Sequence, residues 1–203
     1  MGYAALRWLF FLLIVKPFLL LAVGVNVRHR DRLPVAGPAL IVANHNSHLD
    51  ALVLMAMLPV WLLSRARPVA SAEYFLSNRW RAWFATRVIG IIPVATSGVR
   101  SHADVLGPVR DALAAGDIVI FFPEGTRGEP ERLGKLKTGI VWLAQQLPTT
   151  LIYPVRLHGL GKVLPKGDWL PVPFFCDAWV GEPLHWSGDR RQFLAALSAS
   201  LGG

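Results

Sequence analysis

Charged residues are scarce in this chain of 203 residues, and acidic ones are the scarcest. Charged residues make up 17% of the sequence and apolar residues 53%, whereas an ordinary soluble domain is about 25% charged. Only 13 Asp and Glu stand against 21 Lys and Arg, so the formal net charge is +8. Dense basic runs and known nucleic-acid-binding modules are also absent, which argues against a nucleic-acid partner. A basic, apolar chain instead fits an anionic membrane surface, which offers negative charge and an oily interior.

The sequence has a single cysteine, Cys176, so it can form neither an internal disulfide nor a cysteine-based metal site. Cys176 follows two phenylalanines in an apolar run, which predicts a buried structural thiol. A Gly-x-Ser-x-Gly nucleophile elbow is missing, which argues against a serine hydrolase. Internal repeats and interdomain linkers are missing too, so one domain with a short appendage is predicted.

The appendage is the apolar N-terminus. Two apolar runs, Trp8–Val15 and Pro17–Val25, together approach the roughly 20 residues that span a bilayer. Lys16 and Pro17 interrupt them, and a central charge costs about 3 kcal/mol on insertion scales. The segment can therefore form one kinked span or two short helices in one leaflet. A signal peptide is disfavoured because its apolar region would be split.

We expect a monotopic anchor whose Lys16 ammonium reaches the lipid head groups, on the cytoplasmic face of the cell membrane. In this interpretation residues 1–32 form a membrane-associating helical segment, and residues 33–203 form the main domain. A helix pair that packs only against its own domain stays an alternative.

From Ala39 onward the sequence alternates between strand-like and helix-like segments. Most strand-like runs are continuously apolar, as in strands covered on both faces of a sheet. They are Ala39–Ala43, Pro68–Ala72, Ile89–Val94, Ile118–Phe122, Leu151–Leu157 and Phe174–Val180. The predicted helices are Leu49–Leu58, Asn78–Val88, His102–Ala115, Thr138–Leu147 and Arg190–Leu201. This alternation predicts an α/β fold with a mainly parallel, mixed sheet flanked by helices.

A first polar cluster, Asn44-His45-Asn46-Ser47-His48-Leu49-Asp50, lies between a predicted strand and a predicted helix. Ligand-binding and catalytic sites of α/β proteins usually lie at such a position, after the end of a strand. His45 is a natural base near neutral pH, and Asp50 can orient the imidazole and stabilise the imidazolium. The alternative is a polar turn in which Asp50 caps the helix.

A second polar cluster, Pro123-Glu124-Gly125-Thr126-Arg127-Gly128, follows another predicted strand. The Arg127 guanidinium can hold a phosphate with two parallel hydrogen bonds. Gly125 allows close backbone approach, and Thr126 adds a hydroxyl donor. The alternative is a solvated turn with a Glu–Arg pair.

Three further side chains can contribute to the same site. Glu124 can orient Arg127 or accept a hydrogen bond from a substrate hydroxyl. Lys135 and Lys137 precede the next predicted helix and can add positive charge, although lysines are most often simply solvated.

The two clusters together carry a resemblance to a known family. Asn44-His45-x-Ser47-x-x-Asp50, followed by Phe122-Pro123-Glu124-Gly125-Thr126-Arg127, resembles the 1-acylglycerol-3-phosphate acyltransferase family. Gly90-Ile91-Ile92-Pro93-Val94 is similar to the middle block of that family, and Ile152-Tyr153-Pro154-Val155 is similar to its last block. The resemblance extends from about Leu33 to Leu184.

Two positions depart from the family pattern. Many members continue the middle block with a basic residue that helps to bind the phosphate of the acceptor. Here Ala95 and Thr96 follow, and the nearest arginine is Arg100. Gly128 stands where a serine often follows the second cluster. The first departure leaves another lysolipid open as the acceptor.

The resemblance implies that a fatty acyl group moves from an acyl thioester, on coenzyme A or acyl carrier protein, to the hydroxyl of a lysophospholipid. The first expected acceptor is 1-acylglycerol-3-phosphate. His45 would be the general base, oriented by Asp50, with Asn44 and Ser47 in support. No metal or cofactor is implied. The residues that would seat the acceptor are Glu124, Gly125, Thr126, Arg127 and Lys137.

Two interpretations from other classes stay open. A metal-dependent lipid hydrolase would use His45, His48 and Asp50 as ligands, since imidazole and carboxylate suit zinc or iron. A non-catalytic protein would keep the fold and bind a membrane surface through its basic charge.

Overall fold

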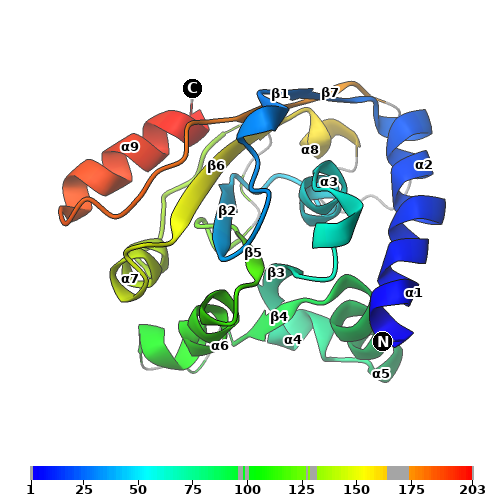
Figure 1. The fold of residues 1–203 in the computed structure, drawn as a ribbon, viewed down its shortest axis with the longest axis horizontal. Helices are drawn as coiled ribbons and strands as arrows, with labels where there is room; N and C mark the ends of the chain where they lie inside the picture. Colours follow the sequence, from blue (N-terminus) through cyan, green and yellow to red (C-terminus); the bar gives the residue numbers. More distant parts are fainter. Residues whose placement is uncertain are drawn as a thin grey trace.

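A seven-stranded sheet forms the centre of the molecule, with helices on both faces (Figure 1). The computed structural model describes residues 2–95, 98, 101–126, 128, 132–163 and 174–202. The strands are β1 (Val25–Arg28), β2 (Ala39–Ala43), β3 (Ala66–Ser71), β4 (Ile92–Val94), β5 (Ile118–Phe121), β6 (Leu151–His158) and β7 (Cys176–Val180). Their order is β1-β7-β6-β2-β5-β3-β4, and among these strands only β6 and β7 pair antiparallel. The predicted α/β fold with a mainly parallel, mixed sheet is confirmed.

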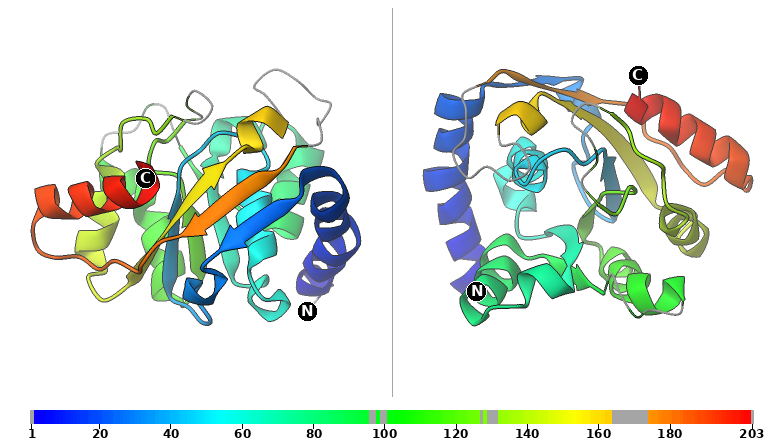
Figure 2. Two further views of the ribbon diagram at one scale, coloured as in Figure 1. Left: turned by 90° about the horizontal axis from the view of Figure 1, so that it is seen from above. Right: turned by 180° about the vertical axis from the view of Figure 1, so that it is seen from behind.

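The two faces of the sheet are buried against separate groups of helices (Figures 1 and 2). One face is covered by α3 (Asp50–Met57) and the N-terminal helix. The other face is covered by α6 (His102–Ala114), α7 (Gly139–Gln146) and α9 (Arg190–Gly202). Alternate residues of β2 and of β5 point into the two cores. This two-sided burial is the reason that both strands are continuously apolar.

The chain leaves the neighbouring strands β2 and β5 in opposite directions. After β2 it passes through α3 to β3, on the far side of β5. After β5 it passes through α7 to β6, on the far side of β2. In open α/β sheets a crevice forms at the carboxyl ends of two such strands and usually holds the ligand. Both polar clusters follow these two strands.

Several boundaries differ from the prediction. Val25–Arg28, predicted as part of the helical N-terminus, instead form β1 and pair with β7. The strand predicted at Ile89–Val94 is shortened to β4, because a π-helical segment ends at Ile89 and Gly90 turns the chain at φ 81°. Phe174 and Phe175 precede β7 instead of belonging to it. Cys176 is buried, as predicted.

The N-terminal segment is one continuous helix, not two separate short ones (Figure 1). It consists of α1 (Gly2–Phe10), α2 (Lys16–Phe18) and two π-helical stretches, Phe11–Val15 and Leu19–Val23. In a regular α-helix, four residues overshoot one turn by about 40°, so the wider π-turns keep a four-residue repeat on one face. The buried side chains follow that repeat: Arg7, Phe11, Val15, Leu19 and Val23.

The opposite face of this helix is apolar and exposed. Its exposed large side chains are Tyr3, Leu6, Trp8, Leu9, Leu12, Leu13, Ile14, Leu20 and Leu21. The helix therefore does not bury its apolar surface against its own domain alone. Such a face is typical of a helix that lies in a membrane interface, and Tyr3–Leu21 is also long and apolar enough to cross a bilayer by length and composition.

The buried side chain of Arg7 links this helix to the rest of the domain. Its guanidinium donates hydrogen bonds of 2.8–3.3 Å to four backbone carbonyls. Burial, together with the nearby charge of Arg67, lowers the pKa of Arg7 to about 10, so the side chain stays charged at neutral pH. The four carbonyls belong to Leu63, Ser64, Ala66 and Val88.

Candidate functional site

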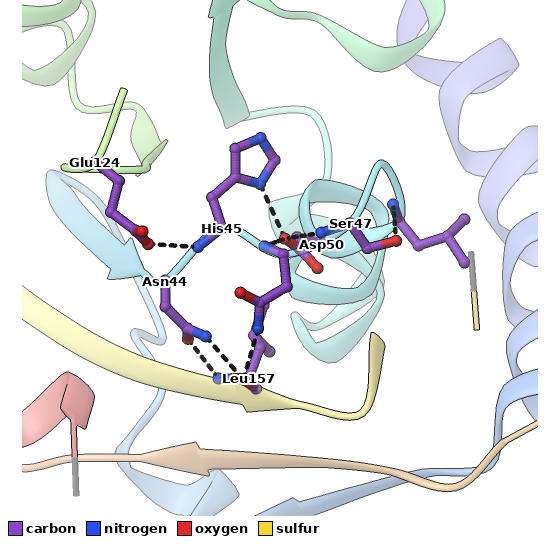
Figure 3. Close-up of polar contacts among 8 residues, drawn as sticks. Asn44, His45, Ser47, Asp50, Glu124 and Leu157 are labelled. Atoms are coloured by element: carbon purple, nitrogen blue, oxygen red, sulfur yellow. Dashed lines mark hydrogen bonds and ion pairs between the residues drawn. The ribbon is translucent and has the colours of Figure 1, made fainter. Parts of the chain in front are cut away.

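The two polar clusters meet at the carboxyl ends of β2 and β5, as Figure 3 shows. The strand register pairs Val42 with Phe121, so the residues after each strand lie at the same edge of the sheet. The His45 N–H donates to Glu124 Oε1 (2.8 Å), and the Gly128 N–H donates to the His45 carbonyl (3.1 Å). Two clusters that are far apart in the sequence thus form one site.

The imidazole of His45 faces the carboxylate of Asp50 (Figure 3). His45 Nδ1 lies 2.9 Å from Asp50 Oδ2, the Asp50 side chain is fully buried, and the His45 side chain is 22% exposed. An ionised carboxylate only accepts hydrogen bonds, so Nδ1 carries the proton of the neutral ring. Nε2 therefore keeps its lone pair, and it is the atom that can take a proton from a substrate.

Backbone N–H groups hold the Asp50 carboxylate in place. Oδ2 also accepts from the N–H groups of Asn46 (2.6 Å) and Ser47 (2.8 Å), both of which precede α3. The alternative of helix capping would place the carboxylate on N–H groups within α3. In the structure the Asp50 carboxylate instead accepts from N–H groups of the loop that carries His45, and it thereby orders that loop.

Asn44 and Ser47 fix the two ends of that loop. The Asn44 amide donates to the Leu157 carbonyl (2.8 Å) and accepts from the Leu157 N–H (2.7 Å), which mimics strand pairing with β6. Ser47 Oγ accepts from the Leu49 N–H (3.3 Å) just before α3. These contacts restrain the backbone on both sides of His45.

Phe122 belongs to the site, although the sequence assigns it no role beyond its place in the second family block. Its ring stacks on the His45 imidazole, with centroids 4.1 Å apart and an interplanar angle of 20°. The imidazole is thus held by a carboxylate at its edge and an aromatic ring against its face. In the sequence, Phe122 ends a predicted apolar strand and begins the second family block, but neither pattern signals a contact with His45.

Glu124 binds backbone on both sides. Oε1 accepts from the His45 N–H and Oε2 from the Gly134 N–H, each at 2.8 Å, and the side chain is buried. Each carboxylate oxygen thus accepts one backbone hydrogen bond, and the predicted bond from a substrate hydroxyl would use one of the remaining lone pairs. We therefore assign Glu124 a positioning role, since it joins the His45 loop to the loop around Gly134.

Glu124→Gln should lower kcat about tenfold and the free energy of unfolding by about 1–3 kcal/mol. An amide offers one acceptor and one donor, so one of the two backbone N–H groups would face another N–H and lose its partner. Initial rates and thermal unfolding measure the two effects. Glu182→Gln, at an exposed ion pair with Arg32, is the matched control. An unchanged melting temperature would show that the two backbone bonds are not formed.

A cleft of about 610 Å³ opens beside Glu124, towards α6 and α7. Its lining includes Thr126 and the two predicted lysines, Lys135 and Lys137. The Lys137 ammonium approaches the backbone of Gly125 so closely that a Cβ there would lie 2.5 Å from Nζ. The cleft is therefore basic, with hydroxyl groups that can donate to an anion.

The sequence analysis does not identify His102 as part of this cleft. Its Nε2 lies 3.0 Å from Thr138 Oγ1, at the junction of α6 and α7. An isolated histidine at the start of a predicted helix gives no sequence signal for such a place. Two arginines of the sequence analysis, Arg100 and Arg127, lie outside the described residues.

The metal-hydrolase alternative lacks a ligand cluster in the part of the chain that the structure describes. No group of three or more His, Cys, Asp or Glu side chains there could hold a metal ion. Asp50 is engaged by His45, whereas the ring of His48 lies near Tyr74 of α4 (Ala72–Phe75), with centroids 6.2 Å apart.

Comparisons with known proteins agree with this architecture. Residues 24–158 match the profile of a family described as Acyltransferase. The chloroplastic 1-acyl-sn-glycerol-3-phosphate acyltransferase LPAT1 of Arabidopsis thaliana is 31% identical over 71% of this chain and 38% of its own length. The 1-acyl-sn-glycerol-3-phosphate acyltransferase alpha of Mus musculus is 30% identical over 94% of this chain and 65% of its own length. The chain thus spans between about a third and two thirds of these relatives.

A solved structure shares the fold. The crystal structure of the 1-acyl-sn-glycerophosphate acyltransferase PlsC from Thermotoga maritima matches with a TM-score of 0.74. The match covers 98% of this chain and 76% of the other chain, at 17% sequence identity. At that identity the likeness concerns the arrangement of helices and strands.

Proposed function

This chain belongs to the acyltransferase family, and from that premise we propose that it moves a fatty acyl group from an acyl thioester to the hydroxyl of a lysophospholipid. The plant and mouse relatives are named for 1-acyl-sn-glycerol-3-phosphate, which we take as the first acceptor to test. The observation that carries the proposal is the 2.9 Å contact between His45 Nδ1 and Asp50 Oδ2 at the crevice between β2 and β5.

His45 acts as the general base. Its Nε2 takes the hydroxyl proton of the acceptor while the acceptor oxygen attacks the thioester carbonyl, and a tetrahedral oxyanion forms. Asp50 stabilises the imidazolium during this step. The oxyanion then collapses, the C–S bond breaks, and the proton passes from Nε2 to the departing thiolate. The products are an ester and a free thiol, and His45 returns to its neutral form.

Transfer is direct in this scheme, without an acyl-enzyme. The Ser47 hydroxyl oxygen accepts a hydrogen bond from the Leu49 N–H, and Cys176 is buried on β7, which β6 separates from β2. The thioester carrier is coenzyme A or acyl carrier protein. The acceptor and product carry acyl chains, so the exposed apolar face of the N-terminal helix supports work at a membrane surface, which we place on the cytoplasmic side.

The acceptor head group sits in the basic cleft. Thr126 and Lys137 line this cleft, Gly125 lies against the Lys137 ammonium, and Arg127 is proposed to hold the phosphate of the head group. A different lysolipid acceptor is the second candidate, because Ala95 occupies a position where many family members carry a basic residue.

Arg127→Ala should raise the KM for a phosphorylated acceptor about 10- to 100-fold, since a charge-assisted hydrogen bond contributes about 1.5–3 kcal/mol. The KM for the thioester should change by less than about twofold. Steady-state kinetics with each substrate varied in turn measure both constants. Arg191→Ala on α9 is the matched control. An unchanged acceptor KM would remove Arg127 from the head-group site.

The proposal as a whole is tested with a panel of lysolipids against acyl-CoA and acyl-carrier-protein donors. Product is identified by mass, and thiol release is followed in parallel. We expect thiol release that depends on the acceptor, with the acylated phospholipid as product. Metal-dependent hydrolysis of lipid, without transfer, would instead support the hydrolase alternative.

A further inference from the structure

Large apolar side chains are exposed on α4 and α5 (Arg79–Trp83), away from the N-terminal helix in sequence. Trp80 is 81% exposed, and Tyr74, Leu76 and Trp83 are each more than 40% exposed. Arg79 and Arg81 are exposed between them. We call these six residues the α4–α5 patch. Tryptophans exposed to this degree are uncommon on soluble surfaces and mark contact sites.

The α4–α5 patch adjoins the exposed apolar face of the N-terminal helix. The helix that begins with α5 packs on α1, where the rings of Phe10 and Phe84 meet edge to face with centroids 5.1 Å apart. Arg87 lies over the ring of Tyr3, 4.8 Å from its centroid. Figure 1 shows α5 beside the N-terminal end of α1. The two apolar surfaces are therefore neighbours.

The α4–α5 patch also adjoins the site. Its Tyr74 ring lies near His48, with centroids 6.2 Å apart, and His48 is in the loop that carries His45 and Asp50. A surface that touches this patch would therefore lie next to the loop that carries His45.

The charge of this region is mainly positive. From α4 to Ala95 the sequence contains Arg79, Arg81 and Arg87 against one acidic residue, Glu73. Arg81 lies over the Tyr74 ring at 4.9 Å, so a cation is held above an aromatic face. Interfacial Trp and Tyr with neighbouring Arg are the side chains that favour the head-group region of a membrane with anionic lipids.

We propose that the α4–α5 patch is a second membrane-contact element, which sets the entrance of the site against an anionic bilayer. The proposal rests on the proposed function, because it supplies the route by which a lipid acceptor reaches His45. A second copy of this chain is a poorer occupant, since two surfaces that each carry an excess of positive charge would repel each other.

The test compares binding of the full-length chain to vesicles of phosphatidylcholine alone and of phosphatidylcholine with 30% phosphatidylglycerol by weight, about the content of a mildly anionic membrane. Trp80→Ser/Trp83→Ser should weaken partition into the mixed vesicles about tenfold, as expected for the loss of two interfacial aromatics. Arg79→Gln/Arg81→Gln should weaken partition into the mixed vesicles and leave phosphatidylcholine binding unchanged. The matched controls are Leu151→Ser and Arg190→Gln/Arg191→Gln, which remove exposed residues elsewhere.

Partition of the Trp80/Trp83 variant that equals that of the parent would overturn the proposal. A parent that is dimeric, with a monomeric Trp80/Trp83 variant and unchanged partition, would overturn it too and assign the patch to contacts between copies. Acyl transfer to a short-chain, water-soluble acceptor separates this test from that of the proposed function. The patch variants should match the parent there within about twofold. A parent inactive on that acceptor and on lipid would refute the function, whereas the partition data would still decide the role of the patch.

Discussion

His45→Ala should lower kcat for acyl transfer about a thousandfold while both KM values stay within about threefold. A positioned base contributes about 10²–10⁴ in rate, and it acts on the transition state rather than on the bound ground state. In this structure the contribution should be in the middle of that range, because Asp50 and Phe122 hold the ring on two sides. Thiol release that depends on a soluble acceptor measures kcat.

His48→Ala is the matched control for this prediction. His48 lies three residues further along the same loop, but its ring lies near Tyr74 rather than Asp50. The kcat of the His48→Ala variant should stay within about threefold of that of the parent. Equal rates for His45→Ala and the parent would mean that another group takes the hydroxyl proton.

Arg7→Met should lower the free energy of unfolding by about 2–4 kcal/mol, which corresponds to roughly 10 °C in melting temperature for a chain of this size. Methionine keeps the apolar length of the side chain but removes the donors of four carbonyls. Each buried acceptor without a partner costs about 1–3 kcal/mol. The Leu63 carbonyl keeps a bond from the Ala66 N–H, so up to three acceptors lose their partner. Relief from the burial of one guanidinium and from its repulsion by Arg67 offsets only part of that loss.

Thermal unfolding in detergent measures this change. Arg65→Met is the matched control, because Arg65 is an exposed arginine near the same turn and should change stability by less than about 0.5 kcal/mol. Gly90→Ala should mimic Arg7→Met, since a Cβ at Gly90 would overlap the Arg7 guanidinium. The double variant should lose less than the sum of the two single losses. Additive losses would show that the two residues do not meet.

Much of the fold follows from patterns that burial imposes on the sequence. β2 and β5 are covered by helices on both faces, so their residues are continuously apolar and the strands are predicted with nearly correct bounds. β1 lies at the edge of the sheet and alternates between half-buried and exposed residues. In the sequence it cannot be told from the end of the apolar N-terminus, because four residues are too short to show a period.

The residue types of the site and the pairing of His45 with Asp50 were predictable, but the partners of its other side chains were not. The spacing of His45 and Asp50 points to a base and its orienting carboxylate because both lie in one short loop. The contacts of Glu124 with the N–H groups of His45 and Gly134 depend on how two loops pack. The stacking of Phe122 depends on the same packing. Contacts of this kind between distant segments leave no local pattern in a single sequence.

The bond between the His45 N–H and Glu124 joins residues 79 positions apart, and it exists only when β2 and β5 are paired. Contacts of such long range form slowly and late in folding. The base is therefore put in place by the assembly of the whole central sheet. During synthesis the chain should remain catalytically silent until its second half has emerged, so an incomplete chain exposed to membrane lipids would not acylate them.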